Sequence, residues 1–353
     1  MQNKPTVQKT YSQKCAACGG DLVFNPKKQM LECVQCGTVL PINSTRTTEK
    51  SFEQLLKDAP TWKNETVVYH CEHCGAKAVV AKNSIAVKCD YCGANNIVKI
   101  EDLPGIRPDT VVAFKITKAE AISRARRWLS RRFFAPRWYK KTVQPENVSG
   151  IYFPAFTFDA QTISIYRGIE VRTHTRTVMR DGKTYTKTYT TRHPFSGTLE
   201  RTFDDVLVPA AETIAASSFA KLKPFSTNQG AAYQKEFLSG FTASHYTKDA
   251  EHCWQEAKKM MNQEIRREII ARKGGTVEGL VVETTTSNIT YKYALLPVYL
   301  GHSEYKGKKY DLYINGETGK VFGNTPVSWG KVFLTVAATL VAVGAAILFA
   351  LSQ

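Results

Sequence analysis

Residues 15–37 read CAACGGDLVFNPKKQMLECVQCG, and residues 71–93 read CEHCGAKAVVAKNSIAVKCDYCG. Each stretch contains two CxxC motifs, each followed by glycine, with fourteen residues between the two motifs, and the second stretch begins fifty-six residues after the first. The pattern is therefore an internal repeat. A CxxC turn places two sulfur atoms on one side of a tight turn, and two facing turns supply the four thiolates that Zn²⁺ prefers.

This repeat predicts two structural Zn²⁺ sites, each with four thiolate ligands and no open position for chemistry. The predicted ligands are Cys15, Cys18, Cys33 and Cys36 in the first site and Cys71, Cys74, Cys89 and Cys92 in the second. Disulfides are the first alternative, but residues 1–14 contain no apolar run typical of a signal peptide. Redox CxxC motifs and iron–sulfur ligation are the others, and the paired motifs favour zinc over both.

The last part of the chain predicts a membrane anchor. Residues 332–351 read VFLTVAATLVAVGAAILFAL, twenty residues without a charge, and a helix of this length spans about 30 Å. A buried core helix is the alternative, but the segment is apolar on all faces. Lys320 and Lys331 precede it, and thiolate sites need reducing surroundings. We therefore expect a single pass through the cell membrane with the large N-terminal part in the cytoplasm.

A basic helix is predicted after the second cysteine repeat. Residues 115–141 contain ten basic residues and one acidic residue, and Thr117 with Glu120 forms a capping-box signature for a helix that ends before Pro136. The expected apolar face consists of Ile122, Ala125, Leu129 and Phe133. The expected opposite face consists of Arg124, Arg127 and Arg131. We predict that these arginines bind a membrane surface or phosphate groups, the alternative being a solvated helix face.

The residues from 146 to 328 alternate between strand-like and helix-like patterns. Threonines alternate with basic and aromatic residues on both sides of Asp181–Gly182. This pattern predicts an exposed β-hairpin. A basic hairpin of two strands is one of the structures that bind nucleic acid. A long helix is expected from about Lys248, capped by Thr247 and ended by Gly274. Further strands are expected in VEGLVVETTTS, ITYKYALLPVYLGHSEY and KKYDLYI. This order of elements predicts an antiparallel α+β domain.

Together these patterns predict an α+β protein made of several parts. They are two N-terminal zinc ribbons (1–45 and 65–101), a linker with a short helix (46–64), a basic amphipathic helix region (102–145), an antiparallel-sheet α+β domain (146–328) and one C-terminal transmembrane helix (329–353).

Several segments resemble a bacterial family of membrane-anchored proteins with TFIIB-type zinc ribbons, often labelled primosomal-helicase-like. The resemblance is carried by the four CxxCG motifs, WLSRRFFAPRW (128–138), IYFPAFTFDA (151–160), FDDVLVPA (203–210) and LPVYLGHSEYKGKKYDLYINGETGKVFG (296–323). It implies an adaptor for phage-shock-type or flotillin-like membrane proteins in envelope-stress operons. The helicase label does not fit, because Thr177 stands where a GxxxxGK[ST] loop ending at Gly182–Thr184 needs its first glycine. We therefore expect no nucleotide-binding motor.

Three classes of function follow from these features. A membrane-anchored adaptor or scaffold that recruits protein partners is the first expectation, because zinc ribbons and a sheet domain offer recognition surfaces without catalytic groups. A membrane-tethered nucleic-acid-binding protein is the alternative, supported by the net charge of +17. An enzyme is not expected, because the sequence contains no GxSxG or HExxH motif and its seven histidines are scattered.

Overall fold

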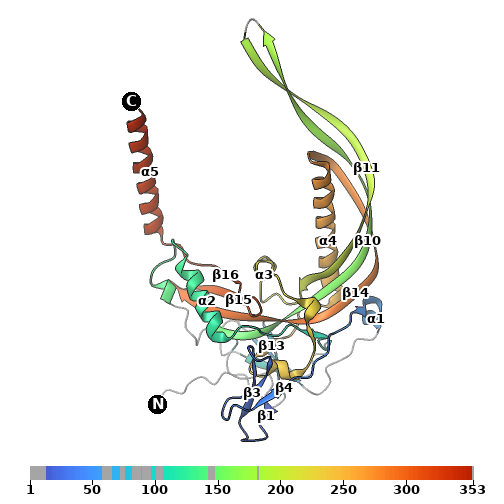
Figure 1. Cartoon of the computed structure of the whole chain (residues 1–353), viewed down its shortest axis with the longest axis vertical. Coiled ribbons are helices and arrows are strands. Elements are labelled where there is room, and N and C mark those ends of the chain that lie inside the picture. Colours follow the sequence, from blue (N-terminus) through green and yellow to red (C-terminus); the bar gives the residue numbers. More distant parts are fainter. Residues whose placement is uncertain are drawn as a thin grey trace.

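The computed structural model describes residues 13–57, 66–71, 76–81, 89, 97–100, 106–141, 148–180 and 183–351. These residues form an α+β structure built on a long, bent, mainly antiparallel sheet. A small cysteine-containing module lies against one side of the sheet, while a β-hairpin and the last helix project from the other side (Figure 1).

The N-terminal module is a four-stranded antiparallel sheet. Its strands are β1 (Gln13–Lys14), β2 (Asp21–Asn25), β3 (Met30–Cys33) and β4 (Val39–Pro41). Leu22, Phe24 and Leu31 are buried, and the Phe24 ring packs edge-on against Phe237 of the body at 5.5 Å. The Phe24 amide also donates to the Ser239 carbonyl at 3.0 Å, so β2 joins the module to the body.

Twelve strands form the main sheet in the described part of the chain. They are β5 (Lys50–Ser51), β6 (Thr66–Cys71), β7 (Lys77–Ala81), β8 (Ile97–Ile100), β9 (Thr110–Val111), β10 (Val148–Arg180), β11 (Lys183–Pro209), β12 (Ala231–Ala232), β13 (Thr242–Ser244), β14 (Thr276–Tyr305), β15 (Lys308–Asn315) and β16 (Val321–Gly323). The path runs β12-β9-β14-β10-β13-β7-β6-β8, with β11 on β10 and with β5 and β15 on β14. Short parallel pairs join β9 to β14 and β10 to β13.

Three very long strands, β10, β11 and β14, are the framework of the sheet. The two segments expected as separate strands before Tyr305 are continuous in β14, because each half pairs with a different part of the long strand β10. The predicted hairpin is present, with Arg180 facing Lys183, and its turn residues Asp181 and Gly182 lie outside the described residues. Beyond Val171 both faces of this hairpin are mostly exposed.

The long strands bend together at Asp159. The register between β10 and β11 shifts at Phe158/Ala160, and that between β10 and β14 shifts at Asp159/Gln161. Asp205 and Asn288 each have φ of 51° at these irregularities. Bulges bend strands and increase their twist, so bulges in β11 and β14 at one level of β10 turn the whole sheet (Figure 1).

Helix α4 (Ala250–Lys273) packs inside this bend, against β10, β11 and β14. The residues of its buried stripe are Ala250, Cys253, Trp254, Ala257, Met261, Ile265 and Ile269. The predicted cap Thr247 is wrong, because the Asp249 carboxylate accepts the His252 amide at 2.7 Å. Gly274 ends the helix with φ of 72°, as predicted.

Helix α2 (Lys118–Ser130) begins with the predicted capping box between Thr117 and Glu120. Ile122, Ala125 and Leu129 are buried as expected. Phe133 was expected on the same helical face, but the helix ends at its cap Arg131, and the Phe133 ring is 64% exposed. The aromatic residues after Ser130 therefore belong to a loop and not to the apolar face of the helix.

The residues expected as a linker contribute to the core of the body. Within their described part, β5 pairs with β14, and α1 (Phe52–Lys57) follows it directly. Phe52 is buried against Phe158 and Trp254, with ring centroids 5.7 Å from each.

The strands around the second cysteine repeat extend the main sheet, because β13 pairs with β7. Helix α3 (Ala216–Leu222) buries Phe219 and Leu222.

Helix α5 (Trp329–Leu351) follows five residues without regular structure, 324–328. Within Trp329–Ala350, the most apolar stretch of 18 residues has a mean hydropathy of 2.5, and none of this stretch is buried in the protein. By length and composition it can cross a membrane once, as the sequence predicted.

Candidate metal centre and membrane anchor

The four cysteines of the first repeat lie together at the end of the N-terminal module. Their sulfur atoms are all within 4.8 Å of one another. The Cys15 and Cys36 sulfurs are 3.7 Å apart, and the Cys18 and Cys33 sulfurs are 3.4 Å apart. Zn–S bonds of about 2.3 Å in a tetrahedron place sulfurs roughly 3.8 Å apart. The cluster therefore fits a tetrahedral metal site, and the predicted grouping of these four residues is confirmed.

Backbone hydrogen bonds hold each cysteine turn closed. The amide of Cys15 donates to the Gly20 carbonyl at 2.7 Å, and the amide of Cys33 donates to the Thr38 carbonyl at 2.8 Å. Gly19 and Gly37 follow the second cysteine of each pair with φ of 71° and 75°. L-side chains rarely adopt these angles, which explains the glycine in each CxxCG motif.

The module favours thiolates at two of the four positions. The Thr38 hydroxyl and amide lower the pKa of Cys36 to about 6, and the amides of Ala17 and Cys18 lower the pKa of Cys15. At Cys18 the Gly20 amide acts in the same direction, but the neighbouring sulfurs outweigh it and raise the pKa to about 12. Four adjacent sulfurs cannot all ionise without a cation, so the donor set suits a divalent metal.

Only half of the second predicted site lies within the described residues. Cys71 and Cys89 are buried, whereas Cys74 and Cys92 lie outside the described residues. The Cys71 amide donates to the Ala76 carbonyl at 2.9 Å. This is the same cysteine-to-fifth-residue bond that closes the two turns of the first repeat.

The three predicted phosphate-binding arginines are exposed on or next to α2. Arg124 donates to the Thr318 carbonyl at 3.1 Å and therefore ties α2 to the turn before β16. Arg127 lies in the last turn of α2, and Arg131 is its C-terminal cap. Binding of lipid or phosphate by these residues stays a prediction.

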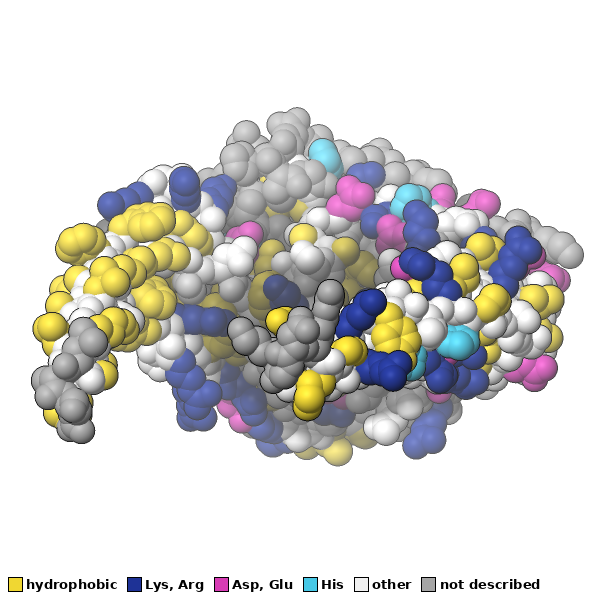
Figure 2. Space-filling view, turned by 90° about the horizontal axis from the view of Figure 1, so that it is seen from above, with side chains coloured by type: hydrophobic (Ala, Val, Ile, Leu, Met, Phe, Trp, Pro, Cys, Tyr) yellow, Lys and Arg dark blue, Asp and Glu magenta, His cyan; other side chains and the backbone are white. Residues whose placement is uncertain are grey.

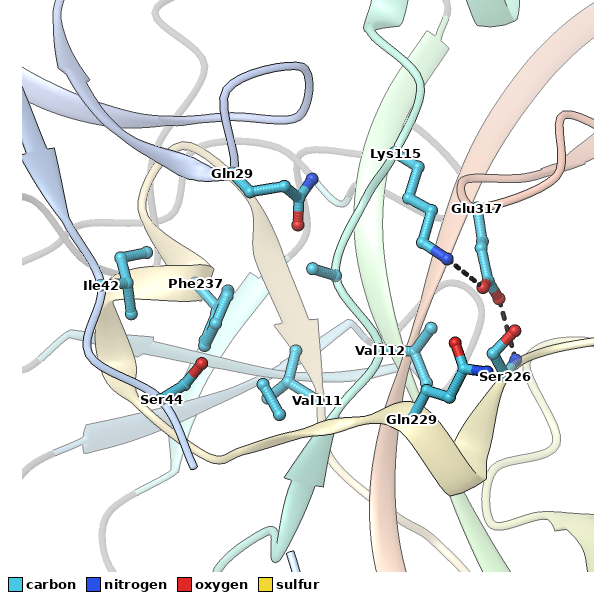
Figure 3. Close-up of a pocket in the computed structure, with 12 residues that line it drawn as sticks. Gln29, Ile42, Ser44, Val111, Val112, Lys115, Ser226, Gln229, Phe237 and Glu317 are labelled. Carbon is cyan, nitrogen blue, oxygen red and sulfur yellow. Dashed lines mark hydrogen bonds and ion pairs between the residues drawn. The ribbon is translucent and has the colours of Figure 1, made fainter. Parts of the chain in front are cut away.

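A cavity of about 260 Å³ lies between the N-terminal module and the body (Figure 3). Gln29 enters it from the module, Phe237 and Val111 form apolar walls, and Lys115 and Glu317 form an ion pair at 2.8 Å. Burial raises the pKa of Glu317, but Lys115 and Ser226 outweigh burial and lower it. Ligand pockets usually occupy about 300–1,000 Å³, so this cavity suits a single side chain better than a cofactor.

A second group of charged residues, which the sequence did not predict, lies at the bend of the sheet. Carboxylate oxygens of Glu49, Asp159 and Asp204 are within 4.8 Å of one another. The ammonium of Lys292, whose side chain is 5% exposed, lies 3.0 Å from Glu49 and 3.1 Å from Asp205. The sequence feature that indicates this charged group is Lys292, a lysine within the apolar run YKYALLPVYL. This cation pairs with two carboxylates, those of Glu49 and Asp205, and gives the group a structural explanation.

The comparison with known proteins finds a relative of similar length. The chain is 27% identical over 327 residues to the uncharacterized protein YdjG of Bacillus subtilis (strain 168). The alignment covers 91% of this chain and 92% of that protein. No family model matches the sequence, and no solved structure matches it.

Proposed function

We propose that this protein is a membrane-anchored zinc-ribbon adaptor that holds a protein partner at the cytoplasmic surface of the cell membrane. The observation that carries the proposal is the arrangement of its two ends. The cysteine module lies on one side of the sheet, and α5 projects from the other (Figure 1). The sheet lies between the module and α5, so a partner can reach the module while α5 anchors the chain (Figure 1).

Zinc in the first module is supported by the sulfur distances and by the lowered pKa values of Cys15 and Cys36. A second zinc site is supported by the repeated sequence and by the bond from the Cys71 amide to the Ala76 carbonyl. Each proposed ion is structural, because four thiolates leave no position for water or substrate. The proposed role is therefore binding without catalysis.

The partner surface is proposed to include the module and the neighbouring cavity. Gln29 reaches from the module into this cavity, and the mixed apolar and charged lining suits a protein side chain. The resemblance to zinc-ribbon membrane proteins predicts phage-shock-type or flotillin-like partners, and envelope stress as the setting.

The test compares the full chain with a variant carrying Cys33→Ser and Cys36→Ser, with Cys253→Ala as the matched control. Cys253 is a buried cysteine of α4 outside both repeats. We expect the double variant to lose one zinc ion per chain and its crosslinked partners, while remaining in the membrane fraction. The control should keep both zinc and partners. Unchanged zinc content or unchanged partners in the double variant contradicts the proposal.

A tethered nucleic-acid binder is the second candidate. The exposed end of the β10–β11 hairpin beyond Val171, which we call the distal hairpin, favours it. Its exposed basic side chains include Arg172, Arg176, Lys187 and Arg192. Phosphate contacts make affinity fall linearly with the logarithm of salt concentration. A salt titration of the full chain with duplex and single-stranded DNA tests this candidate, and the absence of salt-dependent binding removes it.

A further inference from the structure

The loop that follows α2 and the start of α5 form one continuous surface, which we call the collar. Its aromatic residues are Phe133, Phe134, Trp138 and Trp329, and its basic residues are Arg131, Arg132, Arg137, Lys140, Lys141 and Lys331. Two distant parts of the sequence thus meet where the apolar helix leaves the body (Figure 1).

Hydrogen bonds to carbonyl groups of the loop join the two parts of the collar. The amide of Ser328 donates to the Phe134 carbonyl at 2.8 Å. The ammonium of Lys331 donates to the carbonyls of Phe133 at 2.9 Å and Ala135 at 2.7 Å. The loop therefore lies beside the first turn of α5. A surface that contacts this turn also contacts the loop.

The loop separates its side chains into a buried set and an exposed set. Ala135 and Tyr139 are 1% and 2% exposed, and the Tyr139 hydroxyl accepts a hydrogen bond from Ser303 at 2.8 Å. Phe133 and Trp138 are both 64% exposed. The buried residues of the loop hold it against the body. The exposed rings therefore lie on the surface of a fixed loop, where they form an apolar patch.

The same surface is strongly basic. Residues 131–141 read RRFFAPRWYKK, with five basic residues and no acidic residue, and Lys331 adds a sixth cation. Figure 2 shows Lys and Arg side chains on both sides of the base of the apolar helix. Exposed aromatic rings among cations, beside the end of an apolar helix, are the side chains found at the boundary between hydrocarbon and headgroups.

We propose that the collar binds anionic phospholipid headgroups through its basic side chains while Phe133, Phe134 and Trp138 enter the boundary of the hydrocarbon. The proposal rests on the membrane span that is part of the proposed function, and it needs neither zinc nor a protein partner. The occupant follows from continuity, because α5 leads from the collar directly into its apolar segment beginning at Trp329. It also follows from charge, since cations near a bilayer attract anionic lipids.

The test uses the full chain in liposomes of phosphatidylcholine with a minority of phosphatidylglycerol. Trp138 is replaced by the photocrosslinker benzoylphenylalanine, which keeps an aromatic side chain, and Tyr189 of the distal hairpin is replaced in the same way as a control. We expect position 138 to crosslink to lipid, with phosphatidylglycerol enriched above its share of the bilayer. Position 189 should show no such enrichment.

A charge variant tests the role of the cations. Arg131→Gln with Arg137→Gln should reduce the phosphatidylglycerol enrichment at position 138 to about the share of this lipid in the bilayer, because each cation near the surface contributes about 1 kcal/mol to the attraction. The matched control, Arg176→Gln with Lys187→Gln, removes the same charge from exposed hairpin positions and should leave the enrichment unchanged.

Three results overturn the proposal. They are the absence of lipid crosslinks at position 138 in chains that remain in the liposomes, crosslinks to protein instead of lipid, and enrichment that the Arg131 and Arg137 changes do not alter. The first result leaves the membrane span and the adaptor proposal intact. Recovery of the chain outside the liposomes contradicts both proposals, whereas the absence of crosslinked protein partners from the natural chain, together with normal lipid crosslinks, contradicts only the adaptor.

Discussion

Replacement of Asp159 by Asn should make the stability of the protein less dependent on pH between pH 5 and 8. Asp159 lies at the bend of the sheet, where its carboxylate accepts the Asp205 amide at 2.7 Å. Burial and then the neighbouring Glu49 raise the pKa of Asp159 to about 7. The hydrogen bond from Asp159 and the contact with Lys292 lower the pKa of Glu49 to about 2. The two carboxyl groups thus share one proton, which resides on Asp159 near pH 5.

The direction of the effect follows from proton counting. The ordinary pKa of an aspartate is 3.8, so between about pH 4 and pH 7 the folded chain holds one proton more than the unfolded chain at this position. The stability that Asp159 contributes is complete below its unfolded pKa and is lost as the pH rises through about 7. Asparagine, which is neutral at every pH, keeps an acceptor for the Asp205 amide and a donor for Glu49 and removes this dependence.

The magnitude can be bounded from the same pKa. From pH 5 to about 7 the free energy of unfolding falls by about 1.4 kcal/mol per pH unit, which gives an upper limit of about 3 kcal/mol. Asp159 is in partial contact with water, and screening reduces such contributions. We therefore expect the stability difference between Asp159→Asn and the natural chain to grow by about 1.5 kcal/mol between pH 5 and pH 8.

The assay is urea unfolding of the full chain in detergent at pH 5 and pH 8, followed by tryptophan fluorescence. Glu283→Gln, which removes an exposed carboxylate from β14, is the control for loss of charge. The natural chain and the control should both lose stability on going to pH 8 relative to Asp159→Asn. Equal stability differences at the two pH values refute the shared proton.

Three further outcomes are expected. Lys292→Met leaves Glu49 and Asp205 without their cation and should lower the free energy of unfolding by about 3 kcal/mol, which urea midpoints at pH 7 will show. Ile265→Ala removes a fully buried side chain of α4 and should lower the free energy of unfolding by about 2–5 kcal/mol. The control Ile270→Ala, at a 41% exposed position of the same helix, should lower it much less in the same assay. A chain ended after Val327 should leave the membrane fraction and remain in the supernatant after ultracentrifugation; retention in membranes contradicts anchoring by α5.

The features predicted correctly from the sequence depend on residues close together in the chain. The capping box of Thr117 and Glu120 and the end of α4 at Gly274 are local patterns, and both are present. The Asp181–Gly182 turn predicted the pairing of the strands on either side. The clustering of Cys15 with Cys36 depends on a motif whose spacing fixes the geometry. The identity of the metal stays a prediction.

The features that were missed depend on long-range pairing. The cap of α4 is Asp249 and not Thr247, because the amides of Thr247 and Lys248 donate to the distant Ala210 carbonyl and delay the start of the helix. The bend at Asp159 arises from bulges in two partner strands, and no pattern within a single strand indicates their alignment. Lys292 was visible in the sequence, but its partners Glu49 and Asp205 come from separate segments.

The direction of α5 constrains how the body meets a membrane. In Figure 1, α4, the distal hairpin and α5 all project to the same side of the sheet. A flat bilayer around α5 in that direction would also enclose exposed residues such as Arg176 and Lys187, and each such charge at the bilayer centre costs about 2.5–3.5 kcal/mol. Insertion therefore requires α5 to turn relative to the sheet. The irregular residues 324–328 directly precede the helix, so we expect the turn there, beside the collar.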